Sequence, residues 1–167
     1  GYPGHERNPM ARRKATRAAD AAHNGAVLEV QDLVAAFFTR RGVVRAVGGV
    51  SFSLAAGDTL GIVGESGSGK SATALAILRS LPHPGRILGG DIRFLGEDLL
   101  LKSDTEMQRI RGRQIAMIPQ DPTASLNPVM RVGAHLLEVL GVHLGLHGEA
   151  ARKRAVELLD TVGIPEA

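Results

Sequence analysis

The sequence contains neither cysteine nor tryptophan, and aromatic residues make up only 3% of it. Without cysteine, disulfide bonds and thiolate metal sites are excluded, which is compatible with a reducing cytoplasm. No apolar run approaches the length of a membrane span. The formal net charge of +3 is small and does not by itself point to a nucleic-acid partner. The 167 residues, 44% of them hydrophobic, suffice for one domain with an aliphatic core.

Residue types that bind metals or act as catalysts form few recognisable patterns. One histidine pair, His143 and His147, has helical spacing, but Gly145 lies between the two and no third ligand follows at metal spacing. No Ser-His-Asp arrangement is legible. We therefore predict neither a histidine metal site nor a hydrolase triad.

A phosphate-binding loop is the most informative feature that is present. The pattern G-x-x-x-x-G-K-[S/T] is matched at every fixed position by Gly64, Glu65, Ser66, Gly67, Ser68, Gly69, Lys70 and Ser71. Residues 59–63 predict a buried strand entering the loop, and residues 72–78 predict a helix leaving it. This strand–loop–helix context disfavours the alternative, a Gly/Ser-rich turn that binds nothing.

The residue types of the loop suit a nucleoside triphosphate. Glycines at positions 64, 67 and 69 let backbone N–H groups approach the phosphate oxygens, and the next helix directs its positive end to the same place. Lys70 is expected to reach the β- and γ-phosphates. The Ser71 hydroxyl is expected to ligate Mg²⁺.

The remaining pattern predicts a β layer followed by alternating strands and helices. Strands are expected at residues 27–33, 43–47, 50–54 and 114–119, and a short strand and turn at residues 90–96. Helices are expected from the capping box of Ser103 and Glu106 to about residue 111, at 132–144, and at 149–162 with Gly163 as a C-terminal cap. Residues 1–26 lack apolar periodicity and are expected to form a disordered basic tail, in which Met10 is a candidate start.

Two features of the sequence each allow two interpretations. Phe37 and Phe38 suit stacking on a nucleotide base, but packing in the core is favoured on the residues alone. Gln120 follows the predicted strand at 114–119, where α/β proteins place ligand-contacting groups. It suits contact with Mg²⁺ or an attacking water, and equally a turn exposed to solvent.

Three stretches resemble the ATP-binding subunit of an ABC transporter, and more narrowly the dipeptide/oligopeptide importer subfamily. They are residues 46–52, 61–71 and 117–128, the last reading Met-Ile-Pro-Gln-Asp-Pro-Thr-Ala-Ser-Leu-Asn-Pro. This last stretch is highly specific, because other P-loop families lack it. The resemblance covers about residues 28–163.

The resemblance implies an α/β fold of the ABC type of P-loop NTPase. An antiparallel β layer and a parallel core sheet would form an ATP-binding core at residues 27–131, and residues 132–167 would begin a helical subdomain. Gln120 would contact Mg²⁺ and the catalytic water. Phe37 would stack on adenine, with Phe38 as the fallback. Ala72 stands where many relatives have threonine, so a hydroxyl contact to the α-phosphate would be lost.

The same resemblance implies ATP and Mg²⁺ as ligands and a peripheral location at the cytoplasmic face of the plasma membrane. Expected partners are permease subunits, a second cassette subunit and, indirectly, a solute-binding protein, with no nucleic acid. The complete protein would hydrolyse ATP to drive import of peptides or similar solutes. The motifs do not distinguish dipeptides, oligopeptides, nickel or glutathione as cargo.

The family's signature motif, its general-base glutamate and its switch histidine do not occur in this sequence. We therefore expect an amino-terminal, truncated part of the cassette, and hydrolysis by this chain alone stays open. One alternative is a non-catalytic nucleotide-binding or docking fragment. Another is a soluble cassette ATPase that works on nucleic acid or ribosomes, against which residues 120–128 argue.

Overall fold

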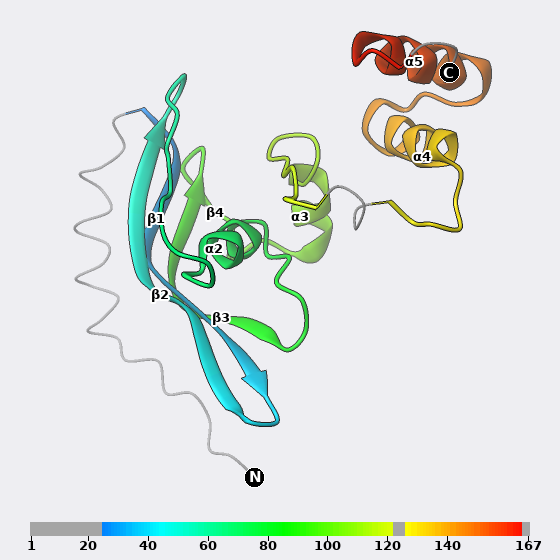
Figure 1. The fold of residues 1–167 in the computed structure, drawn as a ribbon. Helices are drawn as coiled ribbons and strands as arrows, with labels where there is room; N and C mark the ends of the chain where they lie inside the picture. Colours follow the sequence, from blue (N-terminus) through cyan, green and yellow to red (C-terminus); the bar gives the residue numbers. More distant parts are fainter. Residues whose placement is uncertain (1–24, 122–125, 165–167) are drawn as a thin grey trace. The chain divides into compact units, whose positions relative to one another are not determined.

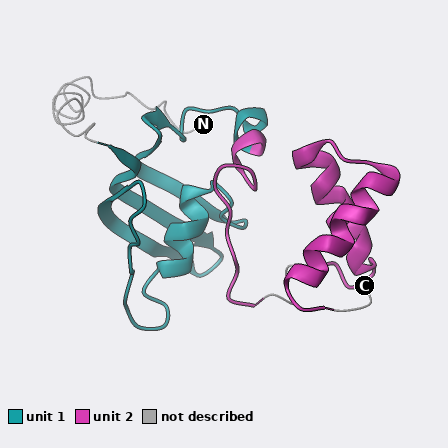
Figure 2. Cartoon of the chain, turned by 90° about the horizontal axis from the view of Figure 1, so that it is seen from above, with its two compact units in different colours: residues 1–107 teal, residues 108–167 magenta. Residues whose placement is uncertain are grey.

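The computed structural model describes residues 25–121 and 126–164. The chain divides into two compact units, residues 1–107 and residues 108–167 (Figure 2). The predicted tail therefore lies outside the described residues, apart from Gly25 and Ala26. The domain boundaries expected from the sequence, at residues 27–131 and 132–167, stay predictions.

An antiparallel sheet in the order β2-β1-β3-β4 forms the first unit (Figure 1). Its strands are β1 (Ala26–Thr39), β2 (Gly42–Ala55), β3 (Gly85–Phe94) and β4 (Glu97–Asp98). A tight turn joins β1 to β2, where the Thr39 hydroxyl donates to the Gly42 carbonyl at 2.8 Å. The antiparallel β layer predicted from the sequence is confirmed.

The strands of this sheet are longer than the sequence pattern predicts. The two strands expected at residues 43–47 and 50–54 are one continuous strand, β2. Gly48 and Gly49 lie between the two expected strands, and β-bulges absorb the irregularity there while pairing with β1 continues on both sides. Similarly, β1 continues past residue 33 and includes both phenylalanines.

Helix α2 (Lys70–Ile77) packs against β1 and β2. It buries Thr73, Ala76 and Ile77 towards a core that the sheet completes with aliphatic side chains, among them Val30, Leu33, Ala35, Ala36, Val47 and Ile92. The helix begins two residues earlier than predicted, at the lysine of the phosphate loop. The sheet therefore supports the helix that carries the candidate site.

Helix α3 (Asp104–Ile110) begins with the predicted capping box. The backbone N–H of Ser103 donates to Glu106 Oε2 at 2.7 Å, and the backbone N–H of Glu106 donates to the Ser103 hydroxyl at 3.3 Å. Two donors that the first turn would otherwise leave unpaired are thereby satisfied.

Helices α4 (Val132–Leu144) and α5 (Gly148–Thr161) form a hairpin in the second unit (Figure 2). Leu140 of α4 packs with Ala151 and Ala155 of α5, and leucines at 136, 137, 146 and 158 surround them. Gly163 ends α5 as predicted: its N–H donates to the Asp160 carbonyl at 3.0 Å, and its φ is 79°.

The strands predicted at residues 59–63 and 114–119 are wrong for this structure: neither segment is assigned as a strand. Val63 is 97% exposed and Ile118 is 95% exposed. Parallel strands are stable when neighbours pair with them and helices cover both faces. Within the described part of the chain no strand pairs with either segment, so their apolar side chains remain in solvent.

Candidate phosphate-binding site

The phosphate loop connects residue 63 to the first turn of α2. Two of its glycines have positive φ angles, 82° at Gly67 and 94° at Gly69. Gly69 is the N-cap of α2 and offers no side chain to the first N–H groups of that helix. The N-terminal end of α2 therefore presents backbone N–H donors and the positive end of the helix dipole to the loop, an arrangement that suits an anion.

Gly69 also fixes the loop against the sheet. A Cβ atom at this position would lie 2.1 Å from the backbone oxygen of Ala46 on β2. Only glycine permits so close an approach. At Gly64 the nearest obstacle is softer, because an added Cβ would lie 2.5 Å from the Ser68 hydroxyl, which can rotate away.

Lys70 folds its side chain back over the loop. Its ammonium group donates to the backbone oxygens of Gly64 and Glu65, at 2.7 and 2.8 Å, and lies 3.3 Å from the Ser68 hydroxyl. The loop thus already curves around one cationic group. An ammonium group at this position can exchange carbonyl oxygens for phosphate oxygens, which are stronger acceptors because they carry charge.

The other residues of the loop are mostly exposed to solvent. Glu65, Ser66 and Ser68 are exposed, and Ser71 presents an exposed hydroxyl one residue into α2. Ala72 is half-buried beside it. The structure therefore brings together all the predicted phosphate-loop residues, and their roles towards a nucleotide stay predictions.

Thr73 supports the loop in a way that the sequence analysis did not predict. Its side chain is buried, and its hydroxyl and backbone N–H donate to the Gly69 carbonyl at 2.9 and 2.8 Å. A threonine four residues after the last loop glycine is the signal that could have indicated this bond.

The two candidate aromatics differ in their surroundings. Phe37 is half-buried, and its ring edge lies 2.8 Å from where a Cβ of Gly85 would be, so it packs on β3. Phe38 is 42% exposed, and the guanidinium carbon of Arg86 lies 5.5 Å from its ring centroid. Phe37 keeps part of its surface accessible, while Phe38 has the more accessible ring.

Gln120 belongs to the second unit, where it is exposed. Residues 122–125 of the importer-like stretch lie outside the described residues. Asn127 of that stretch is held by α4, because its backbone N–H donates to His135 Nε2 at 2.9 Å. Across the described residues no group of three or more histidine, aspartate or glutamate side chains could hold a metal ion.

The comparison with known protein families is decisive. Residues 47–167, more than two thirds of the chain, match the model of the ABC transporter family. This chain belongs to that family. The resemblance inferred from the three sequence stretches is thereby confirmed.

Relatives in this family are named for peptide transport. The oligopeptide transport ATP-binding protein OppD of Bacillus subtilis is 54% identical over 140 residues, which cover 83% of this chain and 39% of that protein. OppD of Escherichia coli is 50% identical over 142 residues, which cover 85% of this chain and 42% of that protein. The chain thus spans about two fifths of the length of these relatives.

Solved structures confirm the fold class. The dimeric bacterial ABC transporter cassette MJ0796 has a TM-score of 0.69 at 21% identity, covering 83% of this chain and 58% of that one. The ADP conformation of MJ1267, an ATP-binding cassette of an ABC transporter, has a TM-score of 0.53 at 24% identity. It covers 83% of this chain and 54% of the other. At these identities the likeness shows the fold of an ABC cassette.

Within the described residues, no helix combines the length and the apolar character needed to cross a membrane.

Proposed function

We propose that this chain is the ATP-binding portion of the subunit that powers an ABC importer of peptides or similar small solutes. The phosphate loop carries the proposal, because Gly69 seats it on β2 and Lys70 already occupies its concave side. Membership of the ABC transporter family and the 50–54% identity to OppD proteins favour a transport subunit over other P-loop proteins.

ATP binding would use the loop in three ways. Backbone N–H groups of the loop and of the start of α2 would donate to the phosphate oxygens. Lys70 would turn from the carbonyls of Gly64 and Glu65 to the β- and γ-phosphates. The cradle fits Mg²⁺ as well, because the exposed hydroxyl of Ser71 stands beside it. The metal would neutralise charge on the triphosphate.

Four further residues are considered around the nucleotide. Phe37 would stack on adenine through the surface that its packing on Gly85 leaves accessible, and Phe38 is the alternative. Gln120 would contact Mg²⁺ and position the attacking water. Ala72 offers no hydroxyl, so the α-phosphate would depend on backbone donors.

The proposed working assembly contains two cassette subunits arranged head to tail, with permease subunits and, indirectly, a solute-binding protein. Its place would be the cytoplasmic face of the plasma membrane. Relatives carry oligopeptide transport in their names, which supports a peptide-type cargo. A non-catalytic nucleotide-binding fragment and a soluble cassette ATPase are the competing functions.

The substitution Lys70→Ala tests the proposal, with Lys153→Ala on the exposed face of α5 as the matched control. Charge-assisted hydrogen bonds are worth about 1.5–3 kcal/mol each, so Lys70→Ala should weaken Mg-ATP binding about ten- to a hundredfold. Lys153→Ala should leave the affinity unchanged. Titration calorimetry measures both, and circular dichroism checks the fold.

An unchanged affinity in folded Lys70→Ala protein would contradict the assignment of the phosphate loop. Hydrolysis well above the Lys70→Ala background would exclude a non-catalytic fragment. Co-purification with membrane permease subunits, rather than with ribosomes or nucleic acid, would separate the transport function from the soluble ATPase.

A further inference from the structure

Arg79 has a backbone conformation that side chains rarely adopt. It follows the last turn of α2 with a φ of 50°, in the left-handed region. Its N–H donates to the Ala76 carbonyl at 2.9 Å, and the N–H of Ser80 donates to the Leu75 carbonyl at 2.8 Å. These two hydrogen bonds are typical of a helix C-terminus at which glycine usually occupies the position that Arg79 has here. An arginine here keeps a strained backbone, which points to a role for its side chain.

The side chain of Arg79 reaches the segment that leads into α3. One guanidinium nitrogen donates to the Leu99 carbonyl at 3.2 Å and also to the Lys102 carbonyl. The other pairs with Asp104 Oδ1 at 3.3 Å. Only 23% of the Arg79 side chain is exposed, and its two bonds to main-chain carbonyls are partly buried, whereas the Asp104 carboxylate is exposed to solvent. The planar guanidinium suits this set, because its five N–H donors can serve several acceptors at once.

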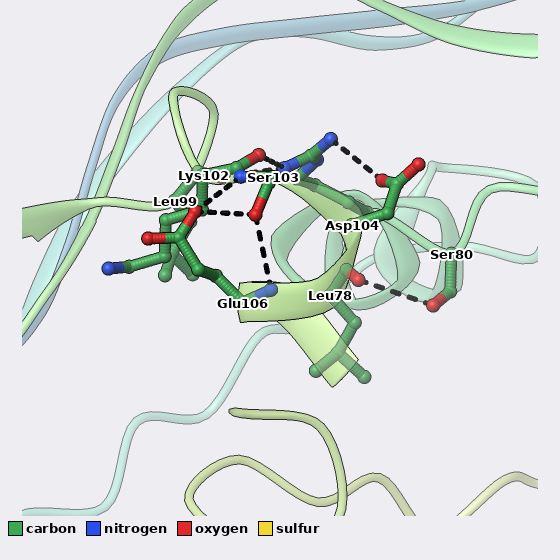
Figure 3. Close-up of polar contacts among 8 residues, drawn as sticks. Leu78, Ser80, Leu99, Lys102, Ser103, Asp104 and Glu106 are labelled. Carbon is green, nitrogen blue, oxygen red and sulfur yellow. Dashed lines mark hydrogen bonds and ion pairs between the residues drawn. The ribbon is translucent and has the colours of Figure 1, made fainter. Parts of the chain in front are cut away.

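The segment held by Arg79 is itself well ordered by other contacts. Figure 3 shows Ser103, Asp104 and Glu106 at the start of α3, beside Leu99 and Lys102. The capping box fixes the first turn of α3, and Leu99 and Met107 are fully buried. Lys102 donates a hydrogen bond to the Glu97 carboxylate, which raises the pKa of Lys102 and favours its charged form. A displacement of Arg79 would therefore move an ordered segment, the start of α3, rather than a mobile loop.

Helix α2 places the phosphate loop and Arg79 at opposite ends of one short element. The loop lysine is its first residue, and Ile77, two residues before Arg79, is its last. Eight helical residues span about 12 Å, so the two ends of α2 lie close to one another. We infer that Arg79 is a positioning residue that transmits nucleotide occupancy of the phosphate loop to the start of α3. This inference rests on the proposed ATP-binding function.

Hydrogen exchange read by mass spectrometry tests this transmission, with Mg-ADP as the probe and the whole protein as the sample. In the wild type, Mg-ADP should slow exchange both in residues 64–77 and in residues 99–107. In Arg79→Gly the slowing should persist in residues 64–77 and be lost in residues 99–107. The readout is the change on adding nucleotide, so a general loss of stability does not mimic it.

Leu95→Gly is the matched control for the backbone. Leu95 has a φ of 51°, the residue is 62% exposed, and an aliphatic side chain forms no hydrogen bonds. Glycine relieves the same kind of strain there, so this variant should respond to Mg-ADP like the wild type. Arg79→Lys keeps the charge with fewer donors and should restore part of the response.

Several results would overturn the inference. One is an Arg79→Gly protein in which Mg-ADP still slows exchange in residues 99–107 as in the wild type. Another is a wild type that responds only in the phosphate loop, which would leave the proposed function intact. No response in the loop itself would instead contradict the proposed function. If Arg79→Gly does not fold, Arg79→Asn tolerates the left-handed backbone, is too short to reach the three acceptors, and is judged by the same criteria.

Discussion

Replacing Gly69 by alanine should destabilise the protein more than replacing any other glycine of the phosphate loop. Gly69 has a φ of 94°, and the new Cβ would lie 2.1 Å from the Ala46 backbone oxygen. That oxygen belongs to β2, which pairs with β1 along its length, so it cannot simply move aside. Gly67 is the matched control: its φ is 82°, and nothing lies within 4 Å of an added Cβ.

The two substitutions share one energetic term and differ in another. A left-handed backbone costs an alanine about 1–2 kcal/mol in either position. The collision at Gly69 adds an overpacking cost of about 1–3 kcal/mol, because the loop must shift away from β2. We therefore expect Gly67→Ala to cost about 1–2 kcal/mol and Gly69→Ala about 2–5 kcal/mol.

Thermal unfolding without nucleotide, followed by circular dichroism, measures this difference. For a chain of this length 1 kcal/mol corresponds to about 2–4 °C in Tm. The midpoint should then fall by roughly 4–20 °C for Gly69→Ala and by roughly 2–8 °C for Gly67→Ala. Equal midpoints for the two variants would refute the reasoning, because the close contact between the loop and β2 would then contribute nothing.

Two further substitutions test the helices. Ser103→Ala removes the capping box with Glu106 and should lower the free energy of unfolding, measured in urea, by about 0.5–2 kcal/mol. Thr105→Ala lies in the same turn but outside the box and should lower it by less. Equal losses in the two variants would argue against the cap. Ala155→Leu should cost about 1–3 kcal/mol, because residue 155 is buried against α4. The exposed Ala150→Leu should change stability by less than about 0.5 kcal/mol, and a similar loss in both variants would count against the packing of the helical hairpin.

Features encoded over a few neighbouring residues were predictable from the sequence. The capping box of α3, the bounds of α4 and the Gly163 cap of α5 depend on bonds within one or two turns, and each forms as predicted. The phosphate loop belongs to the same class, because its glycines and lysine are adjacent in the chain. Bulges were less predictable, since whether Gly48 and Gly49 end a strand or bend it depends on pairing with β1.

Features that depend on distant partners were not predictable in the same way. Residues 59–63 and 114–119 have the aliphatic composition of buried parallel strands, but composition does not supply the neighbours that such strands need. Val63 and Ile118 are almost fully exposed for this reason.

The contacts that fix the two ends of α2 were hidden from the sequence because each involves a main-chain carbonyl. Gly69 approaches the carbonyl of Ala46, and Arg79 donates to those of Leu99 and Lys102. Every residue carries a carbonyl, so no side-chain type at positions 46, 99 or 102 marks the contact. Only the residue that contacts the carbonyl can be recognised by its type. An arginine at a helix end where glycine is favoured becomes informative once its φ angle is known. The phosphate loop can therefore be found by its motif, whereas the residues that hold it in place have to be found by geometry.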